Sequence, residues 1–429
     1  MQMKSQILFE PKSFKNLFLS FLGFFVAFFG WFAFPPLLPL TLKTDLNLTK
    51  ADIANSNILG FTSTLIVRVF SGYLCEKYGP RKTMAWLLLA GSIPTVFTGL
   101  VNNSAGLIAI RFFVGILGGT FVPCQAWITA FYDSNIVGTA NAIAAGVVFY
   151  VMPALVSSIH ISHSWRIAFL FPFGLIVSTA IIILVFGDDG PAGEWKPKII
   201  VLTSTLESNV ELLDRQSELD SNHSDSDDKQ SLPDNLIEYF RFAIKPTTLL
   251  VAIPYLCTFG SELAIEGMIS VLYLSQSQKT GLYLTEQQAG NYAAVFGLMN
   301  IVTRPLGGYI CDFLSVQNKK LFIILLGLLE GLLCIIIGSF HSLEFTTLFI
   351  IMTITGIILE QANGATFSLV SHFERNGIVS GIVGAAGNLG GIIFSLFFRY
   401  DSNFMSILSM GIIIFVLHLL LIIIPLTNK

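Results

Sequence analysis

Two arginines stand in apolar stretches of the sequence, where a charged side chain is expensive. Arg68 follows "LIV" and precedes "VF", and Arg304 follows "IVT" and precedes "PLGG". A lone arginine at the centre of a bilayer costs about 2.5–3.5 kcal/mol on insertion scales, so each needs a role that offsets this cost. One role is a structural ion pair with an acid on another helix, for example Glu262. The other is anion binding, because a guanidinium is planar, permanently charged and forks its donors, which suits a small planar oxyanion.

Neither arginine has an acid within two turns on the central side of its own helix. The sequence therefore predicts an uncompensated, doubly positive pocket if the two side chains converge. Such a pocket is unstable when empty, which favours anion exchange or the loading of an anion together with protons.

The stretch "PYLCTFGSELAIE" offers further candidates for the same chemistry. Tyr255, Phe259 and Glu262 are spaced i, i+4, i+7 and so share one helix face. The aromatic pair is either ordinary packing or a ring surface for the flat face of an anion, with a hydroxyl to bond it. Glu262 is a candidate proton carrier or a partner for an arginine.

Near the C-terminus, "GIVGAAGNLGG" places small residues and one amide at helical spacing. Gly381, Gly384, Asn388 and Gly391 fall at i, i+3, i+7 and i+10, which is a single stripe. Glycines let a helix backbone approach a neighbour or a ligand closely, and Asn388 would offer a donor and an acceptor there. The alternative is a plain packing seam between helices.

Composition shows which elements must position these residues. The 429 residues are 53% hydrophobic and only 12% charged, with a mean hydropathy of +0.73. A helix crosses a bilayer with roughly 20 apolar residues, and we predict twelve such helices. They lie near residues 16–40, 54–76, 84–102, 106–131, 137–161, 166–187, 246–275, 287–313, 320–340, 345–370, 376–398 and 403–426.

The placement of charge predicts the orientation of the chain. Net charge is −3 and by itself indicates no class of partner. Lys and Arg concentrate in the N-terminal tail, the loop after the second predicted helix and the long middle stretch. By the positive-inside rule, both termini and the middle loop are then cytosolic.

The chain divides into two similar parts around a polar segment. We expect an N-terminal six-helix bundle over 1–187, a cytosolic and largely disordered linker over 188–245, and a C-terminal six-helix bundle over 246–429. The linker contains "SELDSNHSDSDDKQS" and has little to bury. Each half also carries an Arg, a Gly four residues on and an acid four further, in "RVFSGYLCE" and "RPLGGYICD". The fold class is thus an all-α membrane protein of two pseudo-symmetric bundles, and such duplicated folds bind substrate between their halves.

The loop after the second helix resembles the signature of the major facilitator superfamily. In "GYLCEKYGPRK" the matching residues are Gly72, Glu76, Gly79 and Arg81. This motif concerns the fold and not the substrate.

Several motifs together resemble the nitrate/nitrite porter family of that superfamily. They are "GIVGAAGNLGG", "YLCTFGSE", "GTANAIAAG" with "VMPAL", and the two arginines. The resemblance implies that Arg68 and Arg304 clamp nitrate or nitrite. It implies further that Tyr255, Phe259, Asn388, Gly384 and Gly387 complete the site.

The resemblance also implies a eukaryotic-type importer in the plasma membrane. Members work as exchangers or as proton-coupled importers, and Glu262 is our candidate for proton coupling. The expected partners are the anion, protons and the lipid bilayer, with an accessory or regulatory protein at the 188–245 loop as a further candidate. No nucleic-acid partner, metal or cofactor is expected.

The chain departs from the family pattern in the fifth predicted helix. Residues 140–156 read "ANAIAAGVVFYVMPALV". Gly146 runs directly into Val147, Val148 and Phe149, where the resemblance implies a first Gly-Asn-Gly-Gly signature. About seven residues of the pattern are absent, and we expect impaired transport in consequence. The alternatives are an inactive or sensing paralogue and a porter for another small organic solute, and none of the three readings is an enzyme.

Overall fold

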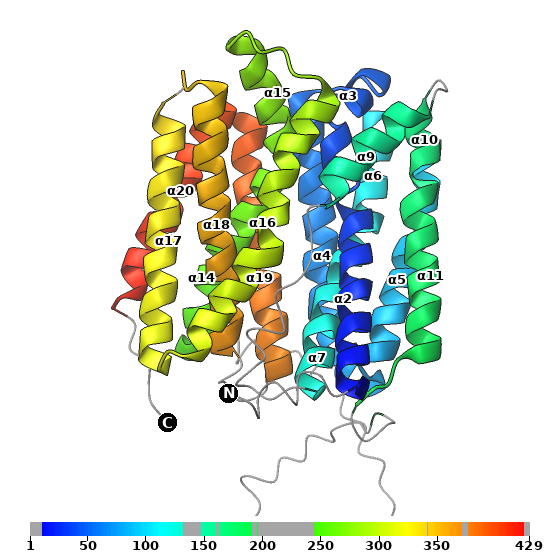
Figure 1. Ribbon diagram of the computed structural model, residues 1–429, viewed down its shortest axis with the longest axis vertical. Coiled ribbons are helices and arrows are strands. Elements are labelled where there is room, and N and C mark those ends of the chain that lie inside the picture. The colour runs from blue at the N-terminus through cyan, green and yellow to red at the C-terminus, as the bar shows by residue number, and fades with distance from the viewer. Residues whose placement is uncertain are drawn as a thin grey trace, which may run out of the picture.

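The computed structural model describes residues 11–131, 147–159, 163–190, 195, 244–340, 342–370 and 376–423, and every element in them is a helix. The first group lies on the right of Figure 1. It comprises α2 (Pro11–Trp31), α3 (Thr41–Asp45), α4 (Lys50–Tyr78), α5 (Pro80–Phe97), α6 (Ser104–Val114), α7 (Phe121–Phe131), α9 (Val147–Ser158), α10 (Ser164–Ala168) and α11 (Leu170–Phe186). Short 3₁₀ turns η1 (Pro35–Leu37), η2 (Thr98–Leu100) and η3 (Gly115–Thr120) join them.

The second group lies on the left of Figure 1. It comprises α14 (Pro246–Glu266), α15 (Ile269–Lys279), α16 (Glu286–Asp312), α17 (Val316–Ser339), α18 (Phe345–Val370), α19 (Asn376–Tyr400) and α20 (Asn403–Leu421). The predicted linker falls almost wholly outside the described residues.

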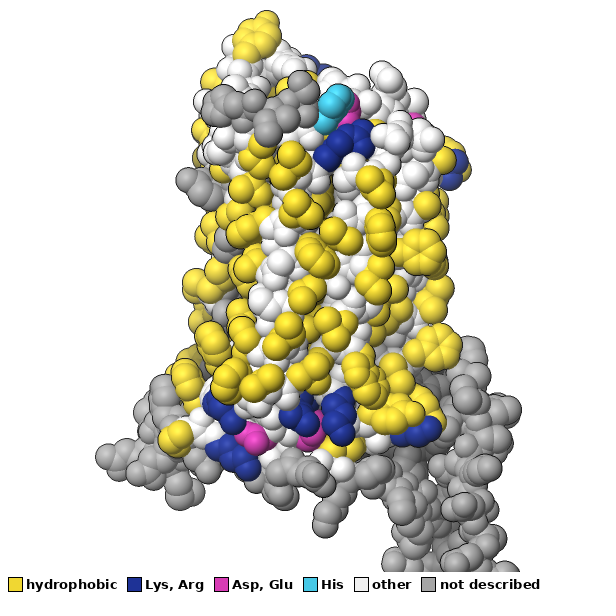
Figure 2. Space-filling model, turned by 90° about the vertical axis from the view of Figure 1, so that its right-hand side faces the viewer, with side chains coloured by type: hydrophobic (Ala, Val, Ile, Leu, Met, Phe, Trp, Pro, Cys, Tyr) yellow, Lys and Arg dark blue, Asp and Glu magenta, His cyan; other side chains and the backbone are white. Residues whose placement is uncertain are grey.

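The protein is a multi-pass membrane protein. Figure 2 shows a broad hydrophobic band on one face, with charged side chains gathered beyond its two ends. Within the described residues, ten helical segments are long and apolar enough to span a bilayer, against the twelve that we predicted. The predicted eighth helix is present as α16, which has 27 residues but carries several polar ones. The predicted fifth helix is described only over its last part, α9, because residues 132–146 lie outside the described ranges.

Local sequence explains where the long helices begin. Thr49 and Asp52 form a capping box at the start of α4. The Thr49 hydroxyl accepts a hydrogen bond from the Asp52 N–H, and the Asp52 carboxylate accepts one from the Thr49 N–H. Thr285 and Gln288 form the corresponding box at the start of α16. Ser402 caps α20 by accepting a hydrogen bond from the Met405 N–H. Helix α4, which carries Arg68, and helix α16, which carries Arg304, therefore start with the same capping motif.

The residues of the superfamily motif lie where α4 turns into α5. Gly79 has φ +90°, which favours glycine, and it both ends α4 and begins α5. Arg81 continues the turn: its Nη1 donates to the Gly187 carbonyl at 3.0 Å, and its Nε lies 3.2 Å from Asp189 Oδ2. Burial raises the pKa of Asp189, and Arg81 opposes that shift. Gly72 is buried in α4, and the Glu76 carbonyl accepts a hydrogen bond from Trp195.

The two groups of helices meet mainly where α4 packs against α19 and α9 packs against α16, and in the described residues α7 also contacts α19. In its described part, α9, the shortened fifth helix adjoins α16, the helix of Arg304.

Polar contacts join the two groups at the end away from Pro11, the upper end of Figure 1. The Glu286 carboxylate accepts hydrogen bonds from the Leu40 and Thr41 N–H groups at 2.8 and 2.9 Å, and from the Thr41 hydroxyl. Asn57 donates to the Gly267 carbonyl at 3.1 Å. These bonds hold the two groups together at this end.

Candidate anion-binding site

Arg68 and Arg304 both lie close to one aromatic ring, that of Phe259. Arg68 projects from α4 and Arg304 from α16, and both are buried. The centroid of the Phe259 ring lies 5.1 Å from Arg68 Cζ and 5.7 Å from Arg304 Cζ. The structure therefore brings together two guanidinium groups that are 236 positions apart in the numbering, one from each group of helices.

Arg68 is held by backbone carbonyls. Its Nε donates to the Gly118 carbonyl at 3.0 Å, and its Nη1 donates to the Gly384 carbonyl of α19 at 2.8 Å. Its Cζ also lies 4.6 Å from the centroid of the Phe121 ring. No carboxylate pairs with it among the residues that the structure describes, and its Nη2 has no hydrogen-bond partner there. Arg68 thus keeps a positive charge and a free donor in the interior.

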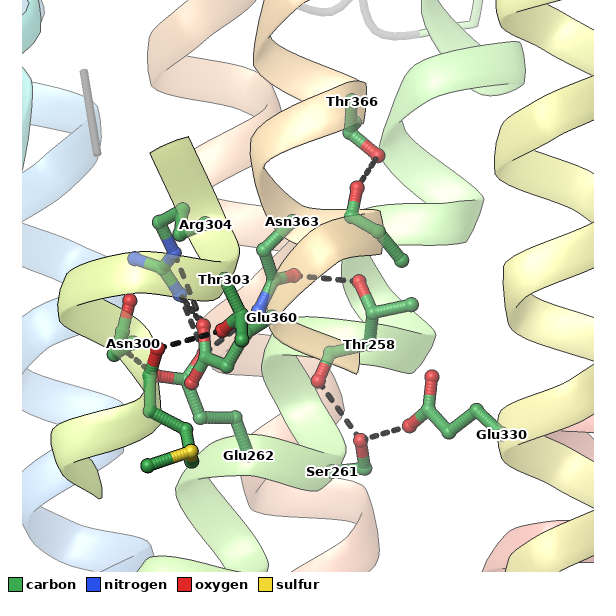
Figure 3. A network of polar contacts seen from close by, with 12 residues as sticks. Thr258, Ser261, Glu262, Asn300, Thr303, Arg304, Glu330, Glu360, Asn363 and Thr366 are labelled. Atoms are coloured by element: carbon green, nitrogen blue, oxygen red, sulfur yellow. Dashed lines mark hydrogen bonds and ion pairs between the residues drawn. The ribbon is translucent and has the colours of Figure 1, made fainter. Parts of the chain in front are cut away.

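Arg304 has a different environment, shown in Figure 3. Its Nη2 lies 2.6 Å from Glu262 Oε2 and 2.9 Å from Glu360 Oε2, and its Nε donates to Glu360 Oε2 at 3.1 Å. The expectation of an uncompensated pair of arginines is therefore wrong for Arg304. The ion pair with Glu262 is present, and a second acid joins it from α18.

Amides complete this network. Asn300 of α16 donates to Glu262 Oε1 at 3.0 Å, and Asn363 of α18 donates to Glu262 Oε2 at 2.7 Å. Asn363 in turn accepts from Thr258 at 2.6 Å. The three donors around Glu262 stabilise its ionised form, whereas Glu360 Oε1 has no partner among the described residues. The sequence reasoning missed Glu360, Asn300 and Asn363, although each is a polar residue in an apolar helix.

An aromatic surface borders both arginines. Tyr255 and Phe259 stack with ring centroids 4.8 Å apart and an interplanar angle of 8°. Phe121 of the other group lies roughly parallel to Phe259 at 6.4 Å. The Tyr255 hydroxyl is buried and has no hydrogen-bond partner among the described residues. This aromatic surface therefore offers flat ring faces and a buried hydroxyl that has no hydrogen-bond partner among the described residues.

Helix α19 approaches this surface through its glycines. Asn388 Nδ2 donates to the Gly384 carbonyl at 3.0 Å, the same carbonyl that Arg68 bonds. Among Gly384, Gly387, Gly390 and Gly391, the tightest approaches fall at Gly387 and Gly390, which lie beside the predicted stripe. A Cβ at Gly387 would lie 2.6 Å from Phe259 Cδ1, and one at Gly390 would lie 1.9 Å from the Leu256 carbonyl oxygen. Gly384 and Asn388 face Arg68, while Gly387 and Gly390 let α19 lie against α14.

A methyl group at Gly387 provides a direct test of this packing. We expect Gly387→Ala to lower the midpoint of thermal unfolding, because overpacking costs about 1–3 kcal/mol and the two stacked rings are buried. The matched control is Gly174→Ala in α11, where a Cβ meets nothing within 4 Å. Equal unfolding temperatures for the two purified variants would contradict the close approach.

The fold and this buried site define a class of protein, a multi-pass membrane transporter. The chain matches the family model described as Major Facilitator Superfamily over residues 20–395. High affinity nitrate transporter 2.5 of Arabidopsis thaliana is 31% identical over 404 residues, which cover 90% of this chain and 74% of that relative. Nitrate transporter 2.2 of Chlamydomonas reinhardtii is 31% identical over 87% of this chain and 71% of its own length. Elsinochrome transporter 1 of Elsinoe fawcettii is 30% identical over 89% of this chain and 86% of its own length.

The chain therefore belongs to the Major Facilitator Superfamily and, within it, to the nitrate/nitrite porter family. It is a transporter and not an enzyme. The resemblance that the motifs predicted is confirmed.

Proposed function

We propose that this protein transports nitrate, and nitrite, across a membrane by alternating access. The observation that carries the proposal is that Arg68 and Arg304, one from each group of helices, both lie beside the Phe259 ring. Transporters with duplicated halves bind substrate at the interface of the halves. The names of several relatives, nitrate transporters of plants and algae, supply the substrate class.

The proposed anion lies between the two guanidinium groups. Arg68 Nη2 and the Tyr255 hydroxyl are buried donors without a partner among the described residues, so an oxyanion would satisfy both. The Tyr255 and Phe259 rings offer a flat surface to a flat anion. Gly384 and Gly387 keep α19 close, and Asn388 adds an amide at the same place.

The partners of Arg304 support a proposal of proton coupling. An anion that binds this guanidinium competes with the carboxylates of Glu262 and Glu360. A buried carboxylate that loses its cation is strongly destabilised, so protonation of these acids favours anion binding. We therefore propose Glu262, together with Glu360, as the proton-coupling residues.

The membrane potential sets the number of protons that uptake requires. Moving one charge against the potential costs about 2.3 kcal/mol per 100 mV. One proton only cancels the charge of the anion, whereas two make uptake electrically favourable. The pair of carboxyls on Arg304 offers two places for protons.

A second candidate function is transport of an organic solute. The relative named elsinochrome transporter favours it. The two buried arginines favour a small anion instead, since a neutral solute would not form an ion pair with Arg68, whose Nη2 has no hydrogen-bond partner among the described residues. An inactive or sensing protein on the same fold remains the alternative that the shortened fifth helix suggests.

Nitrate uptake into proteoliposomes that contain the full-length protein tests the proposal. We expect labelled nitrate to enter faster when the outside is more acidic, and we expect unlabelled nitrite to compete. Empty liposomes give the background rate. Uptake at that background rate, in the presence of correctly inserted protein, would reject transport and favour a sensing role.

We further propose the plasma membrane as the location, with both termini and the 188–245 loop in the cytosol. That loop is also where we place an accessory or regulatory partner. A single cysteine in place of Ser226 should therefore react with an impermeant maleimide only after the cells are permeabilised. Lys43, in α3 at the opposite end of the bundle, is the matched site: Lys43→Cys should react in intact cells. Labelling of the cysteine at 226 from outside intact cells would place the loop outside the cell and contradict the proposed topology.

A further inference from the structure

A series of buried polar atoms without hydrogen-bond partners among the described residues lies along α14 and α15, between Glu262 and the C-terminal end of α15. They are both carboxyl oxygens of Glu266, Ser270 Oγ, Tyr273 Oη and Gln276 Oε1, and none has a hydrogen-bond partner among the described residues. The side chains that carry them are at most 2% exposed. Buried polar groups are nearly always satisfied, and where protein groups do not satisfy them ordered water usually does.

Their spacing suits single bridging waters. A turn at Gly267 and Met268 separates α14 from α15, and in it the Met268 N–H donates to the Ile265 carbonyl at 2.9 Å. Within α14, Glu266 follows Glu262 by four positions, and within α15 the residues Ser270, Tyr273 and Gln276 follow at intervals of three, so neighbours on one helix rise by about 4.5–6 Å along its axis. One water that makes two hydrogen bonds of about 2.8 Å spans that distance.

Contacts with α18 place the series beside the arginine network. The Tyr273 ring meets the rings of Phe345 and Phe349 edge-on, with centroids 5.6 and 6.1 Å away. The same helix carries Glu360, which pairs with Arg304. The series therefore runs inward between α15 and α18 toward Arg304.

The outer end of the series reaches the loop before α18. Gln276 Nε2 donates to the Leu343 carbonyl at 2.6 Å, and Leu343 is only partly buried. Figure 1 shows α15 at the upper end of the molecule, away from Pro11. At the inner end Glu266 lies one turn from Glu262 on the same helix.

The charges at the inner end leave room for protons. Three groups interact electrostatically with Glu266: Glu262 on its own helix, Arg304 on α16 and Glu360 on α18. Arg68 also interacts electrostatically with Glu262, so two guanidinium groups face three carboxyls. Ionised carboxyls in an apolar interior are very costly without a matching cation. Neutrality of this group requires a proton on one of the three carboxyls.

We infer that Glu266, Ser270, Tyr273 and Gln276 line a water-filled path by which protons pass from the outer face to the Glu262–Arg304–Glu360 network. The hydroxyls of Ser270 and Tyr273 both donate and accept, so each can pass a proton between waters. Glu266 takes up the proton and gives it to Glu262, with no other bond made or broken. The inference rests on the proposed proton-coupled import.

The first test separates proton drive from anion passage. In proteoliposomes with the full-length protein, Glu266→Gln should leave nitrate counterflow at equal pH within about twofold of the unaltered protein. Uptake driven by an acidic outside should fall by about tenfold or more, because the amide cannot take up a proton. Glu330→Gln is the matched control, a buried acid of α17 that accepts a hydrogen bond from Ser261, and it should keep both activities. Unchanged proton-driven uptake in Glu266→Gln would overturn the inference.

The second test needs no nitrate and so stands even if the proposed substrate is wrong. Infrared spectra of the unaltered protein minus those of Glu266→Gln should contain a protonated carboxyl band. That band should shift promptly in D₂O, and the double variant Ser270→Ala/Tyr273→Phe should slow the shift. Absence of the band, or exchange at the same rate in the double variant, would overturn the path. Failure of nitrate counterflow in the unaltered protein, with this exchange intact, would reject the substrate alone.

Discussion

Lysine in place of Arg68 should lower nitrate affinity by about 100-fold or more, since loss of a buried charge-assisted contact costs about 2–5 kcal/mol and each 1.4 kcal/mol is tenfold. The ammonium keeps the charge but cannot form the planar fork that bonds the Gly118 and Gly384 carbonyls and still offers Nη2 to the anion. Arg68→Ala should abolish binding. We expect the same loss of binding for Arg304→Ala and nearly the same for Arg304→Lys.

The two arginines differ in what their removal does to the fold. Arg304→Ala leaves the Glu262 and Glu360 carboxylates buried without their cation, and breaking a buried ion pair in this way costs about 3–5 kcal/mol of stability. Arg68 has no carboxylate partner among the described residues, so its variants should remain better folded. Arg68→Lys is therefore the more informative variant of the clamp.

Equilibrium binding of labelled nitrate to the purified protein is the measurement, with thermal unfolding recorded for each variant. Arg111→Lys is the matched control. Arg111 is also buried and bonds the Trp31 carbonyl at 2.8 Å and Asn57 Oδ1 at 2.6 Å, outside the proposed clamp. It should lose stability but keep its nitrate affinity. Normal affinity in a folded Arg68→Lys protein would end the clamp hypothesis.

Insertion of a Gly-Asn-Gly-Gly-type heptad after Gly146 should raise nitrate flux by about tenfold, one order of magnitude on the scale where 1.4 kcal/mol is tenfold. Seven residues are nearly two helical turns, or about 10.5 Å of axis, and their absence turns the flanking faces by only about 20°. The helix can thus insert without them. Helix α9, which follows directly, packs against α16. The absent residues would therefore adjoin the Arg304 helix and add close backbone and an amide to that side of the site.

The control insert has the same length but consists of alanine and leucine. Flux is compared at matched amounts of protein in the membrane. We expect the control to transport no faster than the unaltered chain. If the unaltered chain already matches the restored one, the first signature is dispensable. The side chains of Val147, Val148 and Phe149, which we expect to crowd the site, lie outside the described residues.

Glu360 changes the interpretation of the site more than any other residue. With Glu262 alone, Arg304 would be a neutral pair and protons would have one place to bind. The second carboxylate gives Arg304 two buried acid partners and protons a second place to bind. The proposed coupling of anion binding to protonation rests on these two partners.

The sequence alone predicted the membrane class, most of the helix positions and the residues that carry unusual charge. These follow from local physics. An apolar run of about 20 residues has to cross a bilayer, and Arg68, Arg304 and Glu262 are conspicuous because a charge in such a run is costly. The sequence also predicted that Tyr255 and Phe259 share a face, since one helical period fixes that relation.

Which helices meet and which charges are paired became known from the three-dimensional packing. Helical periodicity says which residues share a face but not what that face touches. Glu360 lies 56 positions after Arg304, on a helix that is neither its neighbour in sequence nor its counterpart in the other half. Likewise the closest approach of α19 falls at Gly387 and Gly390 because α14 lies against that side. Ion pairs between helices depend on distances of a few ångströms across the interior, and those distances are set by the packing of all the helices together.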